Sequence, residues 1–171
     1  MEKKNFIFII CLVLIFGIVS IICFSNGIKF KEVSNDNFTI KYDSTWKVIK
    51  NDNELSLLHK KSKSTLDIKC KVLSDNYIDT KLSDLIDDIV YSISDQNKDY
   101  VLINSTDNIS DKYESYSYLY EKDNKQVMVN IYKKYTKLVI VYYEASSDYF
   151  DIVLDSVDSI LDSLSIIVGE K

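Results

Sequence analysis

Residues 38–50 read FTIKYDSTWKVIK, and this stretch decides how the chain begins to fold. Phe38, Ile40 and Tyr42 alternate with polar residues, which is the period-2 pattern of a half-buried β-strand. Residues 46–49 (WKVI) form a second short run of the same kind, only a few residues further on. Two strands joined by so short a turn are antiparallel, so the stretch predicts an antiparallel sheet.

Similar runs continue along the chain. Residues 55–59 form a third strand, and residues 65–72 show the clearest alternation, with Leu66, Ile68 and Cys70 on one face. We therefore interpret Cys70 as a buried thiol of the core and not as a nucleophile. Four more strand-like runs occupy residues 100–109, 112–121, 125–135 and 137–144, with a hairpin turn at residues 123–124 between the middle pair.

Two segments change to a helical period. Apolar residues recur at intervals of three and four in residues 81–97 and 148–164, so both segments are predicted to be amphipathic helices. Thr80 and Ser147 are the expected N-caps. The order is four strands, a helix, four strands and a helix. It predicts an α+β fold in which one antiparallel sheet is flanked by two helices, an α/β/α sandwich.

The N-terminus carries a membrane signal. Residues 6–24 read FIFIICLVLIFGIVSIICF, without a charge, and as a helix they would be roughly 28 Å long, close to the hydrocarbon thickness of a bilayer. Lys3 and Lys4 favour an N-terminus on the inner side. We expect residues 1–24 to be a cytoplasmic tip and transmembrane signal anchor, residues 25–34 a short tether, and residues 35–168 an extracytoplasmic domain.

Two other fates of this segment stay open. Ser25-Asn26-Gly27 could serve as a signal-peptide cleavage site, which would release the domain as a secreted protein. Cys23 could instead be the lipidated residue of a lipoprotein. The apolar run is longer than a usual signal peptide, so the anchor is the interpretation that we adopt: a single-pass protein of the cell membrane with its C-terminal domain outside.

Composition excludes several classes of protein. The 171 residues are 46% hydrophobic and include thirteen Tyr, which argues against a disordered chain. The net charge is −5 and all 21 basic residues are Lys, so nucleic acid is not an expected partner. The bias toward Lys, Asn and Ile is typical of an AT-rich bacterial coding sequence.

Short motifs give little evidence for catalysis. Residues 44–47 match S-x-x-K and residues 74–76 match S-D-N, as in serine β-lactamases, but no K-T-G follows and the domain is too short for that fold. His59 is the single imidazole and is expected at a strand end. An acidic stripe is expected to be a solvated helix face; it consists of Asp151, Asp155, Asp158 and Asp162. We expect no catalytic residue, no metal site and no cofactor.

Tyrosines are the most distinctive residues. Nine of the thirteen lie between residues 113 and 149. Packing under a helix explains such a cluster, and so does an aromatic surface that binds a protein or a glycan near the membrane. The candidate partner-binding residues are Tyr116, Tyr118, Tyr120, Tyr132 and Tyr142, of which the first three share one strand face.

The FTIKYDSTWKVIK stretch, the helix after the fourth strand, the Tyr-rich hairpins and the closing ILDSLSI (residues 160–166) resemble the PsbP-like fold. That family includes the extrinsic photosystem subunit, a Ran-binding import factor and bacterial DcrB-like membrane-tethered proteins. Trp46 is kept, whereas Tyr42-Asp43 replaces the usual Tyr-Pro.

The resemblance implies an antiparallel sheet between helices and a role in binding or assembly without catalysis. We expect a membrane-anchored binding or assembly module. The alternative is a cell-envelope hydrolase or a small-molecule carrier, which would need a deep pocket with convergent polar groups.

Overall fold

The computed structural model describes residues 29–168, except residues 53, 97–98, 100 and 110–112. Contacts divide the chain into two units, Met1–Phe30 and Lys31–Lys171, and the folded part described below belongs to the second. The predicted membrane anchor of residues 1–24 lies outside the described residues. None of the helices described is long and apolar enough to cross a bilayer.

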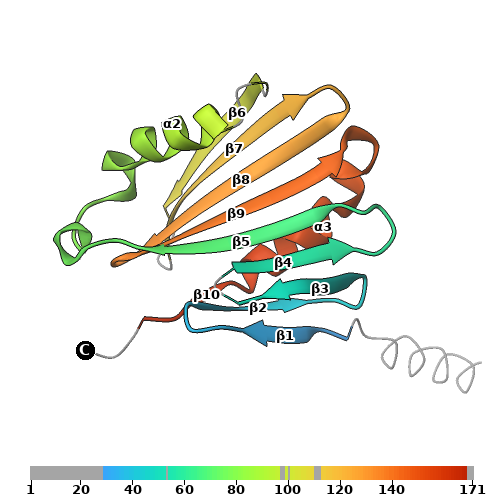
Figure 1. Cartoon of the computed structure of the whole chain (residues 1–171), viewed down its shortest axis with the longest axis horizontal. Helices are drawn as coiled ribbons and strands as arrows, with labels where there is room; N and C mark the ends of the chain where they lie inside the picture. Colours follow the sequence, from blue (N-terminus) through green and yellow to red (C-terminus); the bar gives the residue numbers. More distant parts are fainter. Residues whose placement is uncertain (1–28, 53, 97–98, 100, 110–112, 169–171) are drawn as a thin grey trace, which may run out of the picture. The chain divides into compact units, whose positions relative to one another are not determined.

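The main element is an antiparallel sheet of seven strands in the order β3-β4-β5-β9-β8-β7-β6 (Figure 1). Each predicted strand from residue 46 onward is present; the bounds of β5 are as predicted, and the others have shifted ends. The strands are β3 (Trp46–Asn51), β4 (Glu54–His59), β5 (Thr65–Val72), β6 (Val101–Ile109), β7 (Glu114–Lys122), β8 (Lys125–Lys134) and β9 (Lys137–Ser146). The predicted turn at residues 123–124 joins β7 to β8, and Asp123 adopts a positive φ of 51° there.

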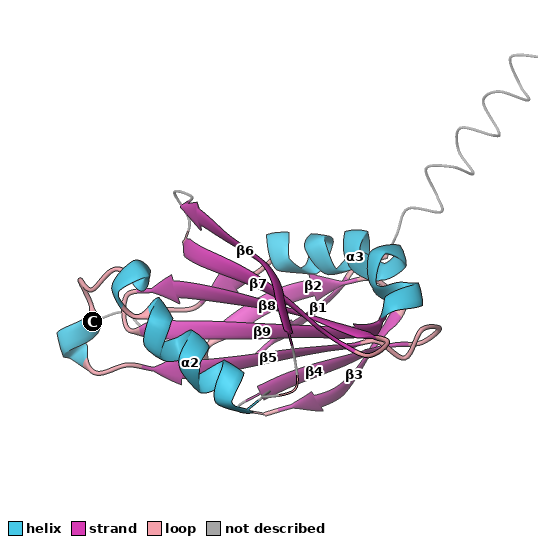
Figure 2. Ribbon diagram, turned by 90° about the horizontal axis from the view of Figure 1, so that it is seen from above, coloured by secondary structure: helices cyan, strands magenta, loops and turns pink. Residues whose placement is uncertain are grey.

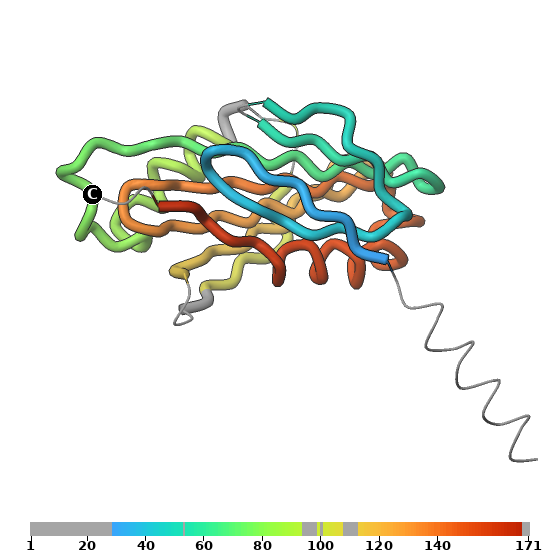
Figure 3. Tube along the Cα trace, turned by 90° about the horizontal axis from the view of Figure 1, so that it is seen from below, coloured from blue at the N-terminus to red at the C-terminus, as the bar shows by residue number. Residues whose placement is uncertain are grey.

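The single predicted sheet is wrong in one respect. Strand β2 (Phe38–Tyr42) does not join the main sheet but pairs with β1 (Lys31–Ser34) and β10 (Ser165–Ile166) in a second, three-stranded sheet. Figure 3 shows the β1–β2 hairpin beside the C-terminal segment. The pairing of Ile166 with Phe38 joins the two ends of the domain, and no local pattern encodes it. β1 also lies within residues 25–34, which the sequence analysis assigns to the tether.

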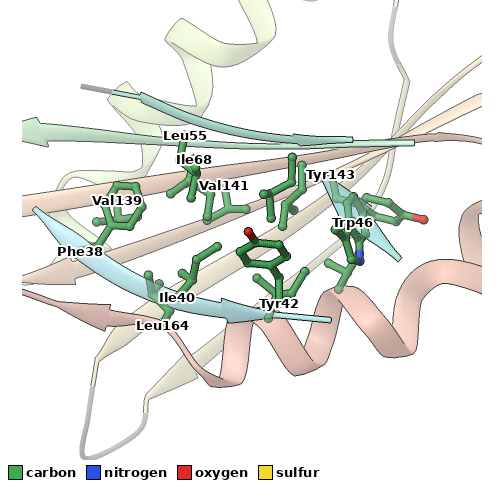
Figure 4. Packing of buried hydrophobic residues seen from close by; sticks show 14 of the residues in the cluster. Phe38, Ile40, Tyr42, Trp46, Leu55, Ile68, Val139, Val141, Tyr143 and Leu164 are labelled. Atoms are coloured by element: carbon green, nitrogen blue, oxygen red, sulfur yellow. The ribbon is translucent and has the colours of Figure 1, made fainter. Parts of the chain in front are cut away.

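The larger core lies between the main sheet and a layer made of the small sheet and α3 (Ser147–Asp162). Phe38, Ile40 and Tyr42 of β2 point toward Ile68 and Val141 of the main sheet (Figure 4). Because strand side chains alternate, the same period that defined β2 also places its apolar face inward. The apolar stripe of α3 is as predicted, and its buried members are Phe150, Val153, Val157 and Ile160.

The opposite face of the main sheet carries α2 (Ile86–Gln96), so the two helices lie on opposite sides of the sheet (Figure 2). Both helical segments start at residues other than those predicted. A 3-10 turn at Leu82–Asp84, with Lys81 and not Thr80 as its N-cap, precedes α2. Ser146 and not Ser147 is the N-cap of α3, because the helix begins one residue earlier than its apolar stripe indicates.

Candidate functional site

The structure divides the five candidate tyrosines between the two faces of the main sheet. Four of them pack in the cluster beneath α2: Tyr116, Tyr118, Tyr120 and Tyr142. Tyr132 packs on the α3 face, where its ring makes an edge contact with Tyr113 at 6.1 Å between centroids. The reason is the register of the β7–β8 hairpin, which places Tyr132 opposite Ser115 and so on the face away from Tyr116. Alternation within one strand could not reveal this.

Burial of these rings is uneven. Tyr120 is almost fully buried, and burial raises the pKa of Tyr132 and of Tyr142 above the ordinary value of 10.0. Tyr118 is half-buried, and its ring stacks on Tyr120 at 6.4 Å between centroids. Most of the cluster therefore contributes to the core beneath α2, and whether its exposed edges also bind a partner stays a prediction.

A hollow lies on the other face of the sheet, between the first turns of α3 and the strands at one edge. It has a volume of about 250 Å³. Its walls are residues 104–106 of β6, residues 117–119 of β7, Met128 of β8, and Phe150, Asp151 and Leu154 of α3. We call it the α3–β6 hollow. The small sheet covers the part of the core farther along, so this hollow is where the apolar face of the main sheet reaches the surface.

The floor of the α3–β6 hollow combines apolar and polar side chains in neighbouring rows. Leu119 and Met128 pair across β7 and β8 and form the apolar row. The next row is Thr106 and Ser117, which line the hollow, and Asn130, which is paired in register with Ser117 just behind the lining. Ser117 Oγ donates to Asn130 Oδ1, and Asn130 is only 4% exposed, with Nδ2 unpartnered among the described residues. Hydrogen-bonding groups thus lie beside an apolar surface, as in many binding sites.

A second hollow, of about 410 Å³, adjoins the beginning of β6. Its walls are Asp99, Val101, Ile103 and residues 121–123, and we call it the acidic hollow. Asp99, Glu121 and Asp123 supply three carboxylates against the ammonium of Lys122, which pairs with Asp99 at 2.7 Å between Nζ and Oδ2. Asp151 adds a carboxylate to the wall of the α3–β6 hollow, so the surface of both hollows beside β6 carries a net negative charge. This combination depends on strand order, so it is not evident from the sequence.

The remaining chemical motifs do not assemble into a site. Ser44 lies in the turn before β3, whereas Ser74 follows the far end of β5, an eight-residue strand about 26 Å long. His59 ends β4, as expected, and its Nδ1 lies 2.7 Å from Ser62 Oγ and also accepts the backbone N–H of Ser62, which is a turn contact. Within the described residues, no group of three or more His, Cys, Asp or Glu could hold a metal ion.

The acidic stripe lies where the sequence places it, and Cys70 faces the core as predicted but is only partly buried. Cys70 packs against the larger core, and burial raises the pKa of its thiol above the ordinary value of 9.0. The four aspartates of α3 are exposed. Burial raises the pKa of Asp158, and the neighbouring carboxylates of Asp162 and Asp155 raise it further.

One buried polar network connects α3 to the strands. Trp46 Nε1 donates to Ser156 Oγ at 2.8 Å, and that hydroxyl donates to Asp43 Oδ2 at 2.9 Å. Asp43 also accepts the hydroxyl and the backbone N–H of Thr45. Partial burial alone would raise the pKa of Asp43, but these hydrogen bonds outweigh it and the pKa is below its ordinary value. The network fixes the β2–β3 turn against α3, which is a structural role.

No known family profile matches the sequence, and no curated protein matches it. Solved structures do. PsbP (CyanoP) from Synechocystis sp. PCC 6803 has a TM-score of 0.63 at 13% identity, over 82% of this chain and 94% of that one.

LpqN of Mycobacterium tuberculosis, whose structure is described as involved in cell envelope biogenesis, has a TM-score of 0.57 at 7% identity, over 84% and 94% of the two chains. PA94 from Pseudomonas aeruginosa, of unknown function, has a TM-score of 0.53 at 9% identity, over 83% and 98%. These similarities confirm the PsbP-like fold.

Proposed function

We propose that this protein is a membrane-anchored extracytoplasmic binding or assembly module, without catalysis, whose partner docks at the α3–β6 hollow. The uncharged run of residues 6–24 supports the anchor, and Lys3 and Lys4 support an inner N-terminus. The involvement of the structurally similar LpqN in cell envelope biogenesis supports a position outside the cytoplasm.

The observation that carries the binding role is the α3–β6 hollow itself. Its volume of about 250 Å³ lies below the roughly 300–1,000 Å³ of small-molecule sites, so it suits one or two side chains of a larger partner. The wall also mixes Phe150 and Leu154 with Asp151 and the hydroxyls of Thr106 and Ser117. An apolar centre with polar groups around it is the usual composition of a protein interface.

The alternative of a carrier or hydrolase would require a deeper site. A carrier encloses most of its ligand, and neither hollow beside β6 is an enclosed space between core residues. A serine hydrolase needs a base oriented by a third group. Within the described residues, the His59–Ser62 pair has no carboxylate hydrogen-bonded to the ring.

The test is affinity capture from the organism's own membranes. The tagged full-length chain is solubilised in detergent after chemical crosslinking, in three forms: wild type, Leu154→Arg, and Ile152→Arg as the matched control. Leu154 lines the α3–β6 hollow, whereas Ile152 on the same helix is 73% exposed and lies outside it.

We expect the same partner with wild type and Ile152→Arg and its loss with Leu154→Arg. Tryptophan fluorescence confirms that each variant is folded. Capture unaffected by Leu154→Arg would contradict the proposed site. Hydrolysis of a cell-wall substrate by the purified chain, with no partner recovered, would contradict the proposed function.

A further inference from the structure

The outer edge of β6 is the starting point. β6 is the last strand of the main sheet, and no described strand pairs with it on its outer side (Figure 1). An edge strand presents unpaired backbone N–H and C=O groups, which accept another strand unless something protects them. Natural proteins commonly protect such edges with lysine, proline or a bulge.

The edges of the main sheet differ in this protection. The opposite edge strand, β3, has exposed Lys47 and Lys50 and a register irregularity near its middle. β6 reads VLINSTDNI, with Asp107 as its single charge. Its irregularity lies near the start, between Leu102 and Asn104, and the remaining six residues, 104–109, pair with β7 in regular register.

The first three side chains of β6 are apolar, yet they are unusually exposed to solvent. Val101 is 68% exposed, Leu102 48% and Ile103 49%. Three consecutive large apolar residues on the surface, at a free sheet edge, are the features of a docking strand or of an aggregation site.

The two hollows follow each other along β6. The acidic hollow contains Val101 and Ile103, and the α3–β6 hollow contains residues 104–106. A strand that paired with β6 would place alternate side chains over these hollows. The walls of the two hollows contain four carboxylates and one ammonium, so a basic segment is complementary to them and a second copy of this acidic chain is not.

We propose that β6 binds an extended segment of a partner protein by strand addition, and that this segment alternates apolar and basic side chains. Its backbone pairs along β6, and its basic side chains lie on the α3 face, near Asp151 and the acidic hollow. Its apolar side chains lie on the opposite face, which the exposed Leu102 shares with Tyr120. The inference rests on the proposed function, because it specifies the partner of the same site.

The test uses the full-length chain in detergent micelles and three synthetic octapeptides. The probe is four repeats of Lys-Val. The second peptide has the same composition in two blocks, four Lys and then four Val. The third is the probe with alternate backbone nitrogens methylated, so that one edge of it cannot donate hydrogen bonds. Binding is measured by calorimetry and by hydrogen–deuterium exchange.

We expect the probe to bind about tenfold or more tightly than the methylated peptide, because three or four backbone hydrogen bonds are worth more than the 1.4 kcal/mol of one decade. The block peptide should also bind more weakly, because it turns only half of its basic side chains toward the acidic face. Exchange should slow in residues 101–109. Ile103→Lys and Asp151→Lys should each weaken binding severalfold, and Ile152→Lys on the outer face of α3 should not.

Three results would overturn the inference: equal binding of the methylated peptide, protection confined to the strands beneath α2, or a dimer in sedimentation that Ile103→Lys abolishes. The last result would identify a second copy as the occupant. If partner capture depends on Leu154 while no peptide binds, the inference fails and the proposed function stands. If the probe binds as expected while no partner is captured, the proposed function fails.

Discussion

Replacing Ser156 by alanine removes the hydroxyl that links Trp46 to Asp43. Trp46 is 1% exposed, so its indole N–H is left with little access to water when Ser156 Oγ is removed. A buried donor left without a partner costs about 1–3 kcal/mol. The carboxylate of Asp43 also loses one hydrogen bond, but it is partly exposed and keeps those from Thr45. Alanine recovers up to about 0.5 kcal/mol through its higher helix propensity.

The free energy of unfolding should therefore fall by about 0.5–2.5 kcal/mol in Ser156→Ala. The matched control is Ser159→Ala on the same helix, because Ser159 Oγ donates only to the Asp155 carbonyl of the preceding turn. The control should be unchanged or slightly more stable. Urea titration of the full-length chain in detergent measures both, with Trp46 as the probe, since it is the single tryptophan.

At acid pH the difference in the free energy of unfolding between wild type and Ser156→Ala should become smaller. The pKa of Asp43 is lowered in the folded state, so its contribution is present above the ordinary value of 3.8 and disappears as the pH falls through the folded value. The part of the stability difference that comes from the buried indole N–H does not depend on pH and therefore remains. If Ser156→Ala and Ser159→Ala unfold at the same urea concentration at neutral pH, the network does not stabilise the fold and the reasoning is refuted.

Three further predictions concern the core, α3 and the N-terminus. In the same urea titration, Ile68→Ala should lower the free energy of unfolding by about 2–5 kcal/mol, because Ile68 is fully buried. Ile152→Ala should change it by less than about 0.5 kcal/mol, because Ile152 is exposed. Equal losses in the two variants would contradict the position of the core. Asp158→Asn should raise the free energy of unfolding by about 0.5 kcal/mol at neutral pH, because the raised pKa of Asp158 means that its charge is unfavourable near the C-terminal end of α3. The gain should vanish at a pH low enough to protonate the carboxyl groups. A lower stability of Asp158→Asn at neutral pH would contradict this prediction. Intact mass of the membrane-extracted protein should show a chain that retains residues 1–24, and a start at residue 28 would show that the segment is cleaved.

Local periodicity was sufficient for most of the secondary structure. The alternation of Leu66, Ile68 and Cys70 correctly predicts both β5 and its inner face, because one face of a strand must be buried wherever a sheet packs. The three-and-four spacing correctly predicts α3, although its N-cap is wrong by one residue. These features depend on neighbours within a few residues of one another.

Longer-range features could not be read in this way. β2 has the same alternation as the strands of the main sheet, yet it pairs with β10, more than 120 residues later. The opposite placement of Tyr132 and Tyr116 follows from a hairpin register that neither strand shows alone. A periodic pattern states which side chains point inward, but it does not state which other segment they meet.

The candidate site belongs to this second group. Its walls come from four separate segments, and the position of β6 at the sheet edge depends on the order of all seven strands. The VLI run at residues 101–103 is visible in the sequence, but its pattern alone predicts an ordinary strand. An apolar strand without a lysine, in a chain with 21 lysines, is the signal that could have identified it.

Photocrosslinking in intact cells tests the central claim most directly. A benzophenone amino acid replaces Thr106, on the wall of the α3–β6 hollow, or Ser159, on the exposed face of α3, in the full-length chain. We expect the probe at position 106 to form one discrete adduct with a protein of the membrane fraction and the probe at position 159 to form none. No adduct at position 106, or the same adduct at both positions, would contradict the central claim.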